Sequence, residues 1–458
     1  MLITGHIDRL TKHTNMKLMR CIALAGVFLG GAYGCQSTVD DININPNEFT
    51  DISTSLLVNH SVLNMASIAE SEAARITGMW SDQFTGSDRQ YITQDKYEVL
   101  DNDFDGIWED LYRDGIVPSE IAQEKATAEN AMGFLGIAQI AEAYYAAEAA
   151  LLFGDVPFTQ ANQANEFPDP AYDNQADVLM AAIDLLETGG QNTGELLVTD
   201  GNDVFTGEGT WRQFANGLRA RYLLAMRDYE GAMMAADSSW SSTDGEALII
   251  HSTTNLAENL FYQFEAEQRA DYLTFTGSYL SQVLADTFPV SRTDDKTDDA
   301  ARLDFYTYTA GGFLRLNTNP GGYFAADQNF PVVGYPEVKL IIAETAARLG
   351  QTDKAIAALN QARNYWDELL GTDSYQDYDA DDFDDDDALL KTILLEKFVS
   401  VFGTPTFYDV VRTDNLVGTF LDGRTEPAQR FLYPSVERSS NNSFPGLKDL
   451  DEPTPINE

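Results

Sequence analysis

Apolar residues recur at three- and four-residue intervals over much of this 458-residue chain, which is the spacing of one face of an α-helix. The clearest case runs from Met132 to Leu152 and ends where Gly154 and Pro157 follow, since neither residue favours continuing a helix. The same period predicts five further helices, at residues 175–186, 210–226, 335–349, 353–366 and 388–402. We therefore expect a mostly helical protein.

One segment carries the spacing of small residues that is typical of a tetratricopeptide helix pair, at Ala343, Gly350, Ala355 and Ala362. Small side chains at these positions let two helices approach closely. The first helix is expected at 337–348 and the second at 354–365. Long polar, aromatic-rich stretches lie between the helices of the chain, around residues 80–107, 190–210, 240–335 and 404–447. The sequence therefore predicts a helical scaffold with long loops.

The N-terminal residues have the order of a lipoprotein signal. Lys17 and Arg20 precede a short apolar stretch from Cys21 to Leu29, and small residues lead from there to Cys35. We expect a signal peptide at 1–34, with Met16 as an alternative start, a lipidated Cys35 and tether at 35–51, and a folded body at 52–458. The apolar stretch is too short to span a bilayer. Ordinary secretion with an incidental cysteine is the alternative.

The composition excludes several classes of function. The 73 Asp and Glu outnumber the 29 Lys and Arg, and the resulting net charge of −44 repels phosphate backbones, so nucleic acid is not an expected partner. Both cysteines lie within the first 35 residues and only four histidines occur, which argues against a zinc site or a disulfide framework. No nucleophile elbow, phosphate loop or His-Glu zinc motif is present. We expect neither an enzyme nor a cofactor.

Two acidic stretches could suggest calcium. The segment Asp101–Gly106 begins like a calcium loop, but Tyr112 stands where such a loop needs a glutamate, so a polar turn that caps the helix of Trp108 and Tyr112 is expected instead. Between Asp373 and Asp387, nine of fifteen residues are aspartate. We expect a solvated acidic loop there, with calcium binding as the alternative, and assign no metal site.

Several segments, in the same order along almost the whole mature chain, resemble the SusD/RagB family of nutrient-binding outer-membrane lipoproteins of Bacteroidetes. No single motif is decisive, but their common order is. The matching segments are residues 45–47, 108–116, 151–158, 167–173, 211–221, 330–337, 343–344, 359–363, 394–398, 402–403 and 433–437.

This resemblance implies a SusD-like fold, with four tetratricopeptide-like helix pairs and a loop-rich inserted region that binds ligand. It also implies a noncatalytic lipoprotein on the outer face of the outer membrane. Such a protein captures an oligo- or polysaccharide and delivers it to a SusC-like TonB-dependent porin. A receptor for peptides, or a structural partner of the porin that binds no ligand, remains an alternative.

Glycan binding needs flat aromatic faces beside polar hydrogen-bonding groups, because sugar rings have apolar faces and polar rims. Three loop stretches, at residues 80–91, 262–279 and 306–323, offer this mix. The negative charge favours a neutral polysaccharide such as a β-glucan. For any single aromatic residue, packing in the core is the alternative, and Trp108, Trp211 and Trp366 are assigned to the core. The expected glycan-binding residues are Trp80, Asp82, Gln83, Arg89, Tyr91, Tyr272, Tyr279, Tyr306, Asn317 and Tyr323.

Overall fold

The computed structural model describes residues 52–285, 292–404, 407–421 and 424–458. Contacts divide the chain into two units, Met1–Ser53 and Thr54–Glu458, and the description below concerns the second. The expected signal peptide and the lipidation site Cys35 lie outside the described residues.

Helices dominate the first half of the second unit, as the apolar period predicts. The helix predicted from Met132 is observed as α8, and the helices predicted at 175–186 and 210–226 are observed as α9 and α10. The bounds are α2 Thr54–Leu63, α3 Met65–Ala69, α4 Glu72–Trp80, α5 Gln90–Asp95, η1 Asp101–Phe104, α6 Asp105–Leu111, η2 Tyr112–Ile116, α7 Val117–Glu129, α8 Met132–Phe153, α9 Gln175–Thr193, α10 Trp211–Ala225 and α11 Tyr229–Asp237.

The second half mixes helices with short strands. The helices are η3 Thr243–Gly245, α12 Leu260–Tyr262, η4 Gln263–Gln268, α13 Tyr279–Leu284, α14 Ala300–Tyr306, α15 Tyr335–Arg348, α16 Thr352–Leu370, η5 Ala380–Asp382, α17 Asp386–Ser400, α18 Phe407–Arg412, α19 Ser435–Ser440 and η7 Pro455–Asn457. The strands are β1 Thr85–Gly86, β2 Phe205–Thr206, β3 Leu248–Ile249, β4 Leu273–Thr274, β5 Thr307–Ala310, β6 Phe313–Leu316 and β7 Phe330–Pro331.

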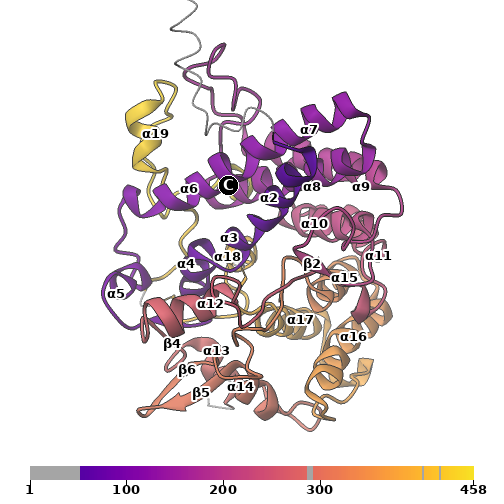
Figure 1. The fold of residues 1–458 in the computed structure, drawn as a ribbon. Coiled ribbons are helices and arrows are strands. Elements are labelled where there is room, and N and C mark those ends of the chain that lie inside the picture. Colours follow the sequence, from indigo (N-terminus) through magenta and orange to yellow (C-terminus); the bar gives the residue numbers. More distant parts are fainter. Residues whose placement is uncertain (1–51, 286–291, 405–406, 422–423) are drawn as a thin grey trace, which may run out of the picture. The chain divides into compact units, whose positions relative to one another are not determined.

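The long helices pack as a series of neighbours. Helix α8 contacts α7 and α9, α9 contacts α10, α10 contacts α11, and α11 contacts α15, which packs on α16 and α17 (Figure 1). At one contact the backbones of α8 and α9 nearly touch, because a Cβ added to Gly136 would lie 2.5 Å from the carbonyl oxygen of Gly189. Glycine is therefore required at this crossing. Among the described helices, none is both long and apolar enough to cross a membrane.

The predicted helix pair is present as α15 and α16. Gly350 turns the chain between them with a φ of +70°, a conformation that glycine adopts without strain. Ala343, Ala355 and Ala362 are buried where the two helices meet. The series of packed helices is consistent with the expected four tetratricopeptide-like pairs, and the mostly helical fold is confirmed.

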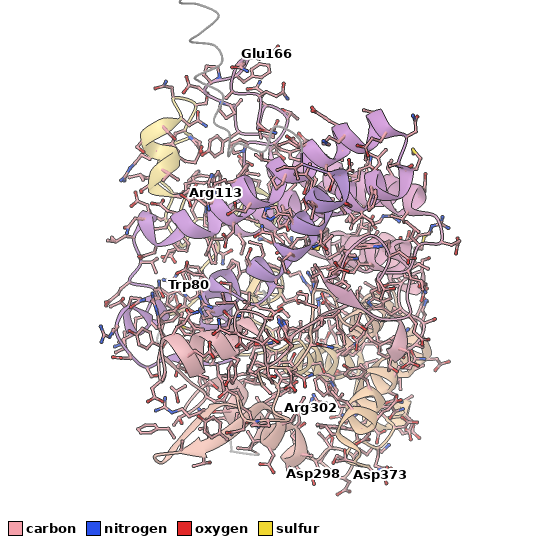
Figure 2. All side chains as sticks on the ribbon, in the orientation of Figure 1. Trp80, Arg113, Glu166, Asp298, Arg302 and Asp373 are labelled. Carbon is pink, nitrogen blue, oxygen red and sulfur yellow. The ribbon has the colours of Figure 1, made fainter. Side chains whose placement is uncertain are left out.

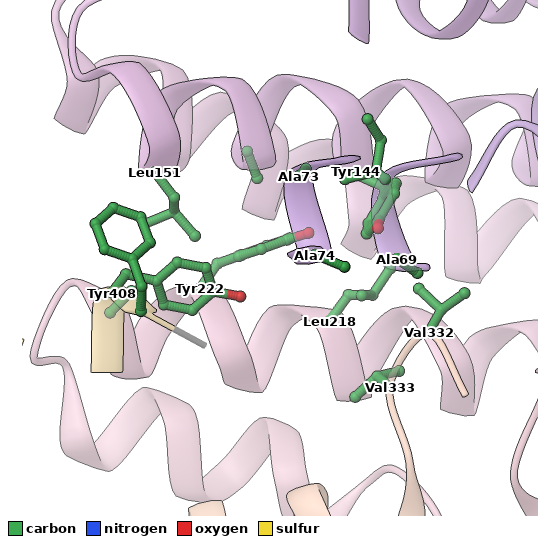
Figure 3. Close-up of a cluster of buried hydrophobic side chains, with 14 of the residues drawn as sticks. Ala69, Ala73, Ala74, Tyr144, Leu151, Leu218, Tyr222, Val332, Val333 and Tyr408 are labelled. Carbon is green, nitrogen blue, oxygen red and sulfur yellow. The ribbon is translucent and has the colours of Figure 1, made fainter. Parts of the chain in front are cut away.

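The core joins helices that are distant in the sequence. Figure 3 shows alanines of α3 and α4 packed near Tyr144 of α8 and Leu218 of α10. A buried ion pair crosses the same region, where Arg221 of α10 contacts Glu337 of α15 at 2.7 Å. The predicted core positions of Trp108, Trp211 and Trp366 are confirmed, since each is buried.

Both acidic stretches cap helices. The Asp103 side chain accepts a hydrogen bond from the Leu100 N–H at 2.8 Å, which caps the short helix η1. The expected polar turn is therefore a helical turn, and α6 itself begins without a side-chain cap. In the aspartate-rich loop, Asp385 accepts from the Ala388 N–H at the start of α17. Asp382 forms an ion pair with Lys296. Within the described residues, no group of three or more His, Cys, Asp or Glu is placed to hold a metal ion.

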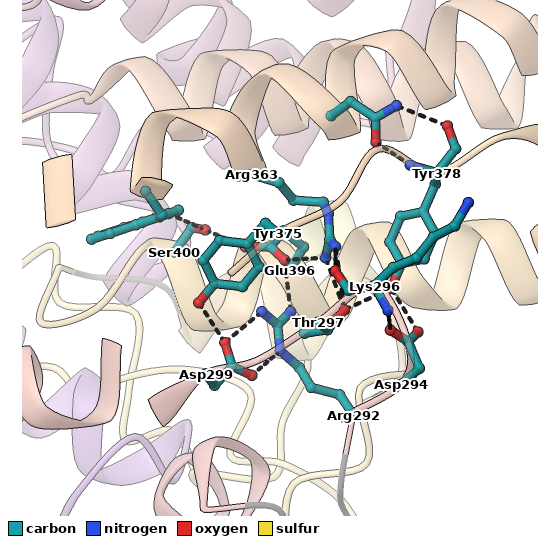
Figure 4. A network of polar contacts seen from close by, with 12 residues as sticks. Arg292, Asp294, Lys296, Thr297, Asp299, Arg363, Tyr375, Tyr378, Glu396 and Ser400 are labelled. Atoms are coloured by element: carbon teal, nitrogen blue, oxygen red, sulfur yellow. Dashed lines mark hydrogen bonds and ion pairs between the residues drawn. The ribbon is translucent and has the colours of Figure 1, made fainter. Parts of the chain in front are cut away.

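A second buried ionic cluster ties α14, α16 and α17 together. Figure 4 shows Arg292, Asp299, Arg363 and Glu396 of this cluster. Glu396 accepts from Arg292 at 2.7 Å and from Arg302 at 2.9 Å, and Arg363 lies 3.7 Å away. Arg292 also forms an ion pair with Asp299, at 2.6 Å. Burial alone would raise the pKa of Glu396, but the three guanidinium groups hold it well below its usual value. We call Arg292, Asp299, Arg302, Arg363 and Glu396 the arginine cluster.

The chain around this cluster is held by backbone pairing. Figure 2 places Asp298 and Asp373 side by side below Arg302. The Asp298 N–H there donates to the carbonyl oxygen of Ser374 at 3.0 Å. An isolated β-bridge between Thr297 and Tyr375 continues the contact. The acidic loop is therefore fastened at one end to the segment that carries Thr297 and Asp298.

Candidate functional site

Two of the predicted binding loops meet through a short strand pair. Strands β1 and β4 are antiparallel, with Thr85 opposite Thr274 and Gly86 opposite Leu273. The Ser87 N–H extends the pairing by donating to the carbonyl oxygen of Tyr272 at 2.8 Å. Gly86 has no room for a side chain, because a Cβ there would lie 2.0 Å from the carbonyl oxygen of Tyr91.

The third predicted loop joins the same place through the β5–β6 hairpin, which lies beside β4 (Figure 1). The Phe275 N–H donates to the carbonyl oxygen of Leu314 at 3.0 Å. Arg315 forms an ion pair with Asp271 at 3.2 Å. Residues 85–91, 262–276 and 307–316 thus form one surface, which we call the loop junction.

Tyr272 is the half-buried aromatic residue at the centre of the loop junction. Its ring packs against two buried rings in T-shaped pairs, Tyr91 at 5.9 Å and Phe264 at 6.1 Å between centroids. The guanidinium carbons of Arg89 and Arg269, both exposed, lie 5.9 and 5.8 Å from its centroid. An aromatic ring flanked by exposed hydrogen-bond donors is what a sugar ring requires.

A second aromatic surface lies on the hairpin. The side chain of Phe313 is 50% exposed at the start of β6, and Arg315 lies 5.2 Å from its ring centroid. This open aromatic side chain offers one more flat contact face. Tyr272 and Phe313 therefore provide accessible rings at the loop junction.

Buried groups fix the position of these side chains from below. The Arg75 Nε–H donates to the Tyr91 hydroxyl at 2.9 Å, and the Arg75 guanidinium lies 4.1 Å from the centroid of Phe264. Glu265 accepts from the Leu273 N–H at 2.9 Å. Burial raises the pKa of Glu265 to about 8, although the Leu273 N–H and Arg315 favour the charged form.

This raised pKa predicts a pH-dependent stability. A carboxyl with a raised pKa binds its proton more tightly in the folded state, so its stabilising effect is complete below about pH 4.5 and declines as the pH rises through about 8. In the wild type this carboxyl should lower the free energy of unfolding as the pH rises from about 4.5 to above 8. We expect Glu265→Gln to make that fall smaller by about 1–3 kcal/mol, as measured by urea unfolding at several pH values in this range. The exposed neighbour Glu267 is the control. If Glu267→Gln and Glu265→Gln change the profile equally, the carboxyl at 265 is not the cause.

Seven of the ten predicted glycan-binding residues are buried in the core, and these predictions are corrected. Trp80 is 1% exposed, and its Nε1–H donates to the carbonyl oxygen of Gln94 at 3.0 Å. Gln83 donates to the carbonyl oxygen of Val401 at 2.9 Å. A side chain without an exposed face has none to offer a sugar. The seven buried residues are Trp80, Asp82, Gln83, Tyr91, Tyr279, Tyr306 and Tyr323.

The buried tyrosines have a shared structural role. The hydroxyls of Tyr279, Tyr306 and Tyr323 donate to backbone carbonyl oxygens of residues 417, 399 and 402, at 2.7, 3.0 and 3.1 Å. They therefore anchor the inserted region to the C-terminal part of the chain. Asn317, which is half-buried, holds the turn after β6 by donating to the carbonyl oxygen of Asp304 at 2.9 Å.

Two predicted residues, Arg89 and Tyr272, remain in accessible positions at the loop junction. Phe313 and Arg315 were missed by the sequence analysis. The signal that could have identified them is local, because Gly311 and Gly312 both have positive φ and form the turn of a β-hairpin. Strand alternation after that turn places residues 313 and 315 on one face.

The comparisons with known proteins agree with this fold. Residues 46–406 match the model of a SusD-like family described as starch-binding and associating with the outer membrane. No curated protein matches the chain.

Solved structures with the same fold cover most of the chain. A SusD homologue of Bacteroides fragilis is 16% identical with a TM-score of 0.68, over 89% of this chain and 100% of the other. A SusD/RagB family protein of Bacteroides thetaiotaomicron is 17% identical with a TM-score of 0.60, over 86% and 95%. A chitin-binding SusD homologue of Flavobacterium johnsoniae is 14% identical with a TM-score of 0.65, over 84% and 93%.

The match to the family model covers well over half of the chain, and the helical series with its inserted loops is the fold shared by these structures. The resemblance inferred from the ordered motifs is thereby confirmed. This protein belongs to the SusD-like family of glycan-binding proteins associated with the outer membrane.

Proposed function

We propose that the protein binds a neutral polysaccharide at the loop junction and passes it, chemically unchanged, to a SusC-like TonB-dependent transporter in the outer membrane. The observation that carries this proposal is the ring of Tyr272 flanked by the guanidinium groups of Arg89 and Arg269. Stacking on the ring would hold one sugar unit, and the arginines would donate hydrogen bonds to its hydroxyls.

An open surface suits a long chain better than an enclosed pocket does. The loop junction combines Tyr272 with the exposed Phe313 of the neighbouring hairpin, so more than one unit of a polymer could be contacted. The chitin-binding homologue of Flavobacterium johnsoniae supports a β-linked neutral glycan as the ligand class. Lipidation at Cys35 would hold the protein at the outer face of the membrane, and the helical series would contact the transporter.

The test compares two half-buried tyrosines, each with a guanidinium group near its ring, on different parts of the chain. Tyr229 of α11 is half-buried like Tyr272, and the guanidinium of Arg348 lies 5.1 Å from its ring centroid. We expect Tyr272→Ala to weaken polysaccharide affinity about tenfold, because a stacking contact is lost, whereas Tyr229→Ala leaves affinity unchanged. Retardation in native gels containing a β-glucan, chitin oligosaccharides or a uronate polymer measures this, followed by calorimetry.

Each outcome of the test separates the proposed function from its alternatives. Equal effects of the two substitutions would remove the loop junction as the binding surface. Absence of retardation by every polysaccharide would favour a peptide receptor or a structural partner of the transporter. Preference for the uronate polymer would contradict the neutral ligand.

A further inference from the structure

A cavity lies between the α15–α16 hairpin and the segments that carry η3, β3 and β7. Its volume is about 370 Å³, within the range of sites that hold small molecules. Its walls include Phe305, Tyr323 and Tyr365. None of its lining residues belongs to the loop junction, so the two sites are separate.

The walls combine aromatic rings with hydrogen-bonding groups. Phe305 and Tyr365 are both partly exposed, and Glu246 accepts from the Tyr365 hydroxyl at 3.1 Å and from the Tyr335 N–H at 2.8 Å. These two bonds hold the Glu246 carboxyl in place. Aromatic faces beside oriented oxygen atoms match the apolar faces and polar rim of a sugar ring.

The charges in the cavity limit which sugars fit. Asp244, Glu246 and Glu368 line it together with the amides of Gln328 and Asn329, whereas no Lys, Arg or His is among the described residues that line it. A carboxylate or sulfate on a ligand would therefore meet like charge without a compensating cation. An uncharged sugar meets no such repulsion.

At one end the cavity adjoins a small recess of about 20 Å³, with which it shares Tyr323 and Ser400 among other residues. Thr404 lines the recess and is 4% exposed, and its Oγ1 has no hydrogen-bond partner among the described residues. Ser400, by contrast, is satisfied, since it accepts from Trp366 and donates to Glu396. A buried hydroxyl without a partner is costly, and a recess of this size holds one small polar group.

We propose that this cavity is a separate site for a single uncharged sugar ring, held against Phe305 and Tyr365, with one of its hydroxyls hydrogen-bonded to Thr404 in the recess. The site suits a monosaccharide or the terminal unit of a short oligosaccharide, because its volume of about 370 Å³ is at the small end of the range for ligand sites. It does not depend on polysaccharide binding at the loop junction.

The test is calorimetric titration of the purified protein with glucose, galactose, mannose, xylose and N-acetylglucosamine, and with glucuronate as the charged counterpart. We expect saturable binding of at least one neutral sugar and none of glucuronate. Thr404→Val should lower that affinity about tenfold without lowering the melting temperature, because the hydroxyl that it removes has no hydrogen-bond partner among the described residues. Tyr272→Ala should leave it unchanged.

A second variant keeps the test decisive. Leu369 lines the cavity and is largely exposed, so Leu369→Trp should obstruct the space while the protein stays folded. Loss of monosaccharide binding in this variant supports the proposal. The proposal is overturned if no neutral sugar binds saturably. It is also overturned if both variants bind the sugar as tightly as the wild type does, or if glucuronate binds as tightly as the neutral sugar. If only Tyr272→Ala abolishes monosaccharide binding, the sugar binds at the loop junction and the proposal of a separate site is wrong.

Discussion

Replacing Glu396 by glutamine is expected to lower the free energy of unfolding by about 3–5 kcal/mol. Glu396 is 1% exposed and faces three buried guanidinium groups, those of Arg292, Arg302 and Arg363. Once residue 396 carries no charge, Asp299 is the carboxylate that remains in the arginine cluster. A buried charge that loses its partner keeps the cost of leaving water and loses the attraction that offset it.

Urea unfolding measures this effect, with Glu187→Gln as the matched control. Glu187 pairs with Arg219 at 2.8 Å, but its side chain is 50% exposed, so loss of its charge should cost less than about 1 kcal/mol. Equal effects of the two substitutions would show that the arginine cluster contributes no more than a surface ion pair.

The same variant should alter the response to acid. Since the guanidinium groups hold the pKa of Glu396 well below its usual value, the unfolded chain binds the proton first as the pH falls. The stabilisation is therefore complete above about pH 4.5 and declines below it. The stability difference between the wild type and Glu396→Gln should shrink as the pH decreases through this range. A difference that stays constant would contradict the ionic origin.

Trp80→Ala is expected to cost about 3–5 kcal/mol of stability through the cavity that it leaves. The ring contacts Tyr97 at 5.3 Å and Phe431 at 5.1 Å between centroids, and it also packs on Phe104 and Phe407. Among folded molecules, polysaccharide affinity should remain that of the wild type, because no face of the indole is available to a ligand. Urea unfolding and calorimetry at low temperature measure the two quantities.

Phe313→Ala is the control for this prediction, because Phe313 is aromatic but 50% exposed. It should change stability by less than about 0.5 kcal/mol and weaken polysaccharide binding instead. If Trp80→Ala retains its stability and loses affinity, Trp80 contacts the ligand after all.

The helices were predictable because their signal is local. Each backbone hydrogen bond of a helix joins residues four apart, and the apolar face repeats on the same scale. The helix predicted from 132 to 152 is α8, and the pair predicted around Gly350 is α15 and α16, with ends that differ by a few residues. The order of the matching segments along the chain was enough to identify the family.

The loop aromatics were harder because their surroundings come from distant parts of the chain. Thr85 meets Thr274 across 189 residues, and the Gln83 amide reaches the carbonyl oxygen of Val401 across 318. Trp80 and Tyr272 both stand in aromatic-rich polar segments, yet the first is buried and the second is accessible. Composition alone did not separate them.

The sequence by itself determined the helical scaffold, the acidic character and the family, since these depend on local periodicity, on counts of charged residues and on the order of motifs. Only the tertiary structure decided which aromatic residues face solvent and that three loops form one surface. It also showed that Thr404 is buried beside a cavity, with no hydrogen-bond partner for its hydroxyl in the part of the chain that the structure describes. The physical reason is that burial is a property of the assembled chain, set by contacts between residues hundreds of positions apart.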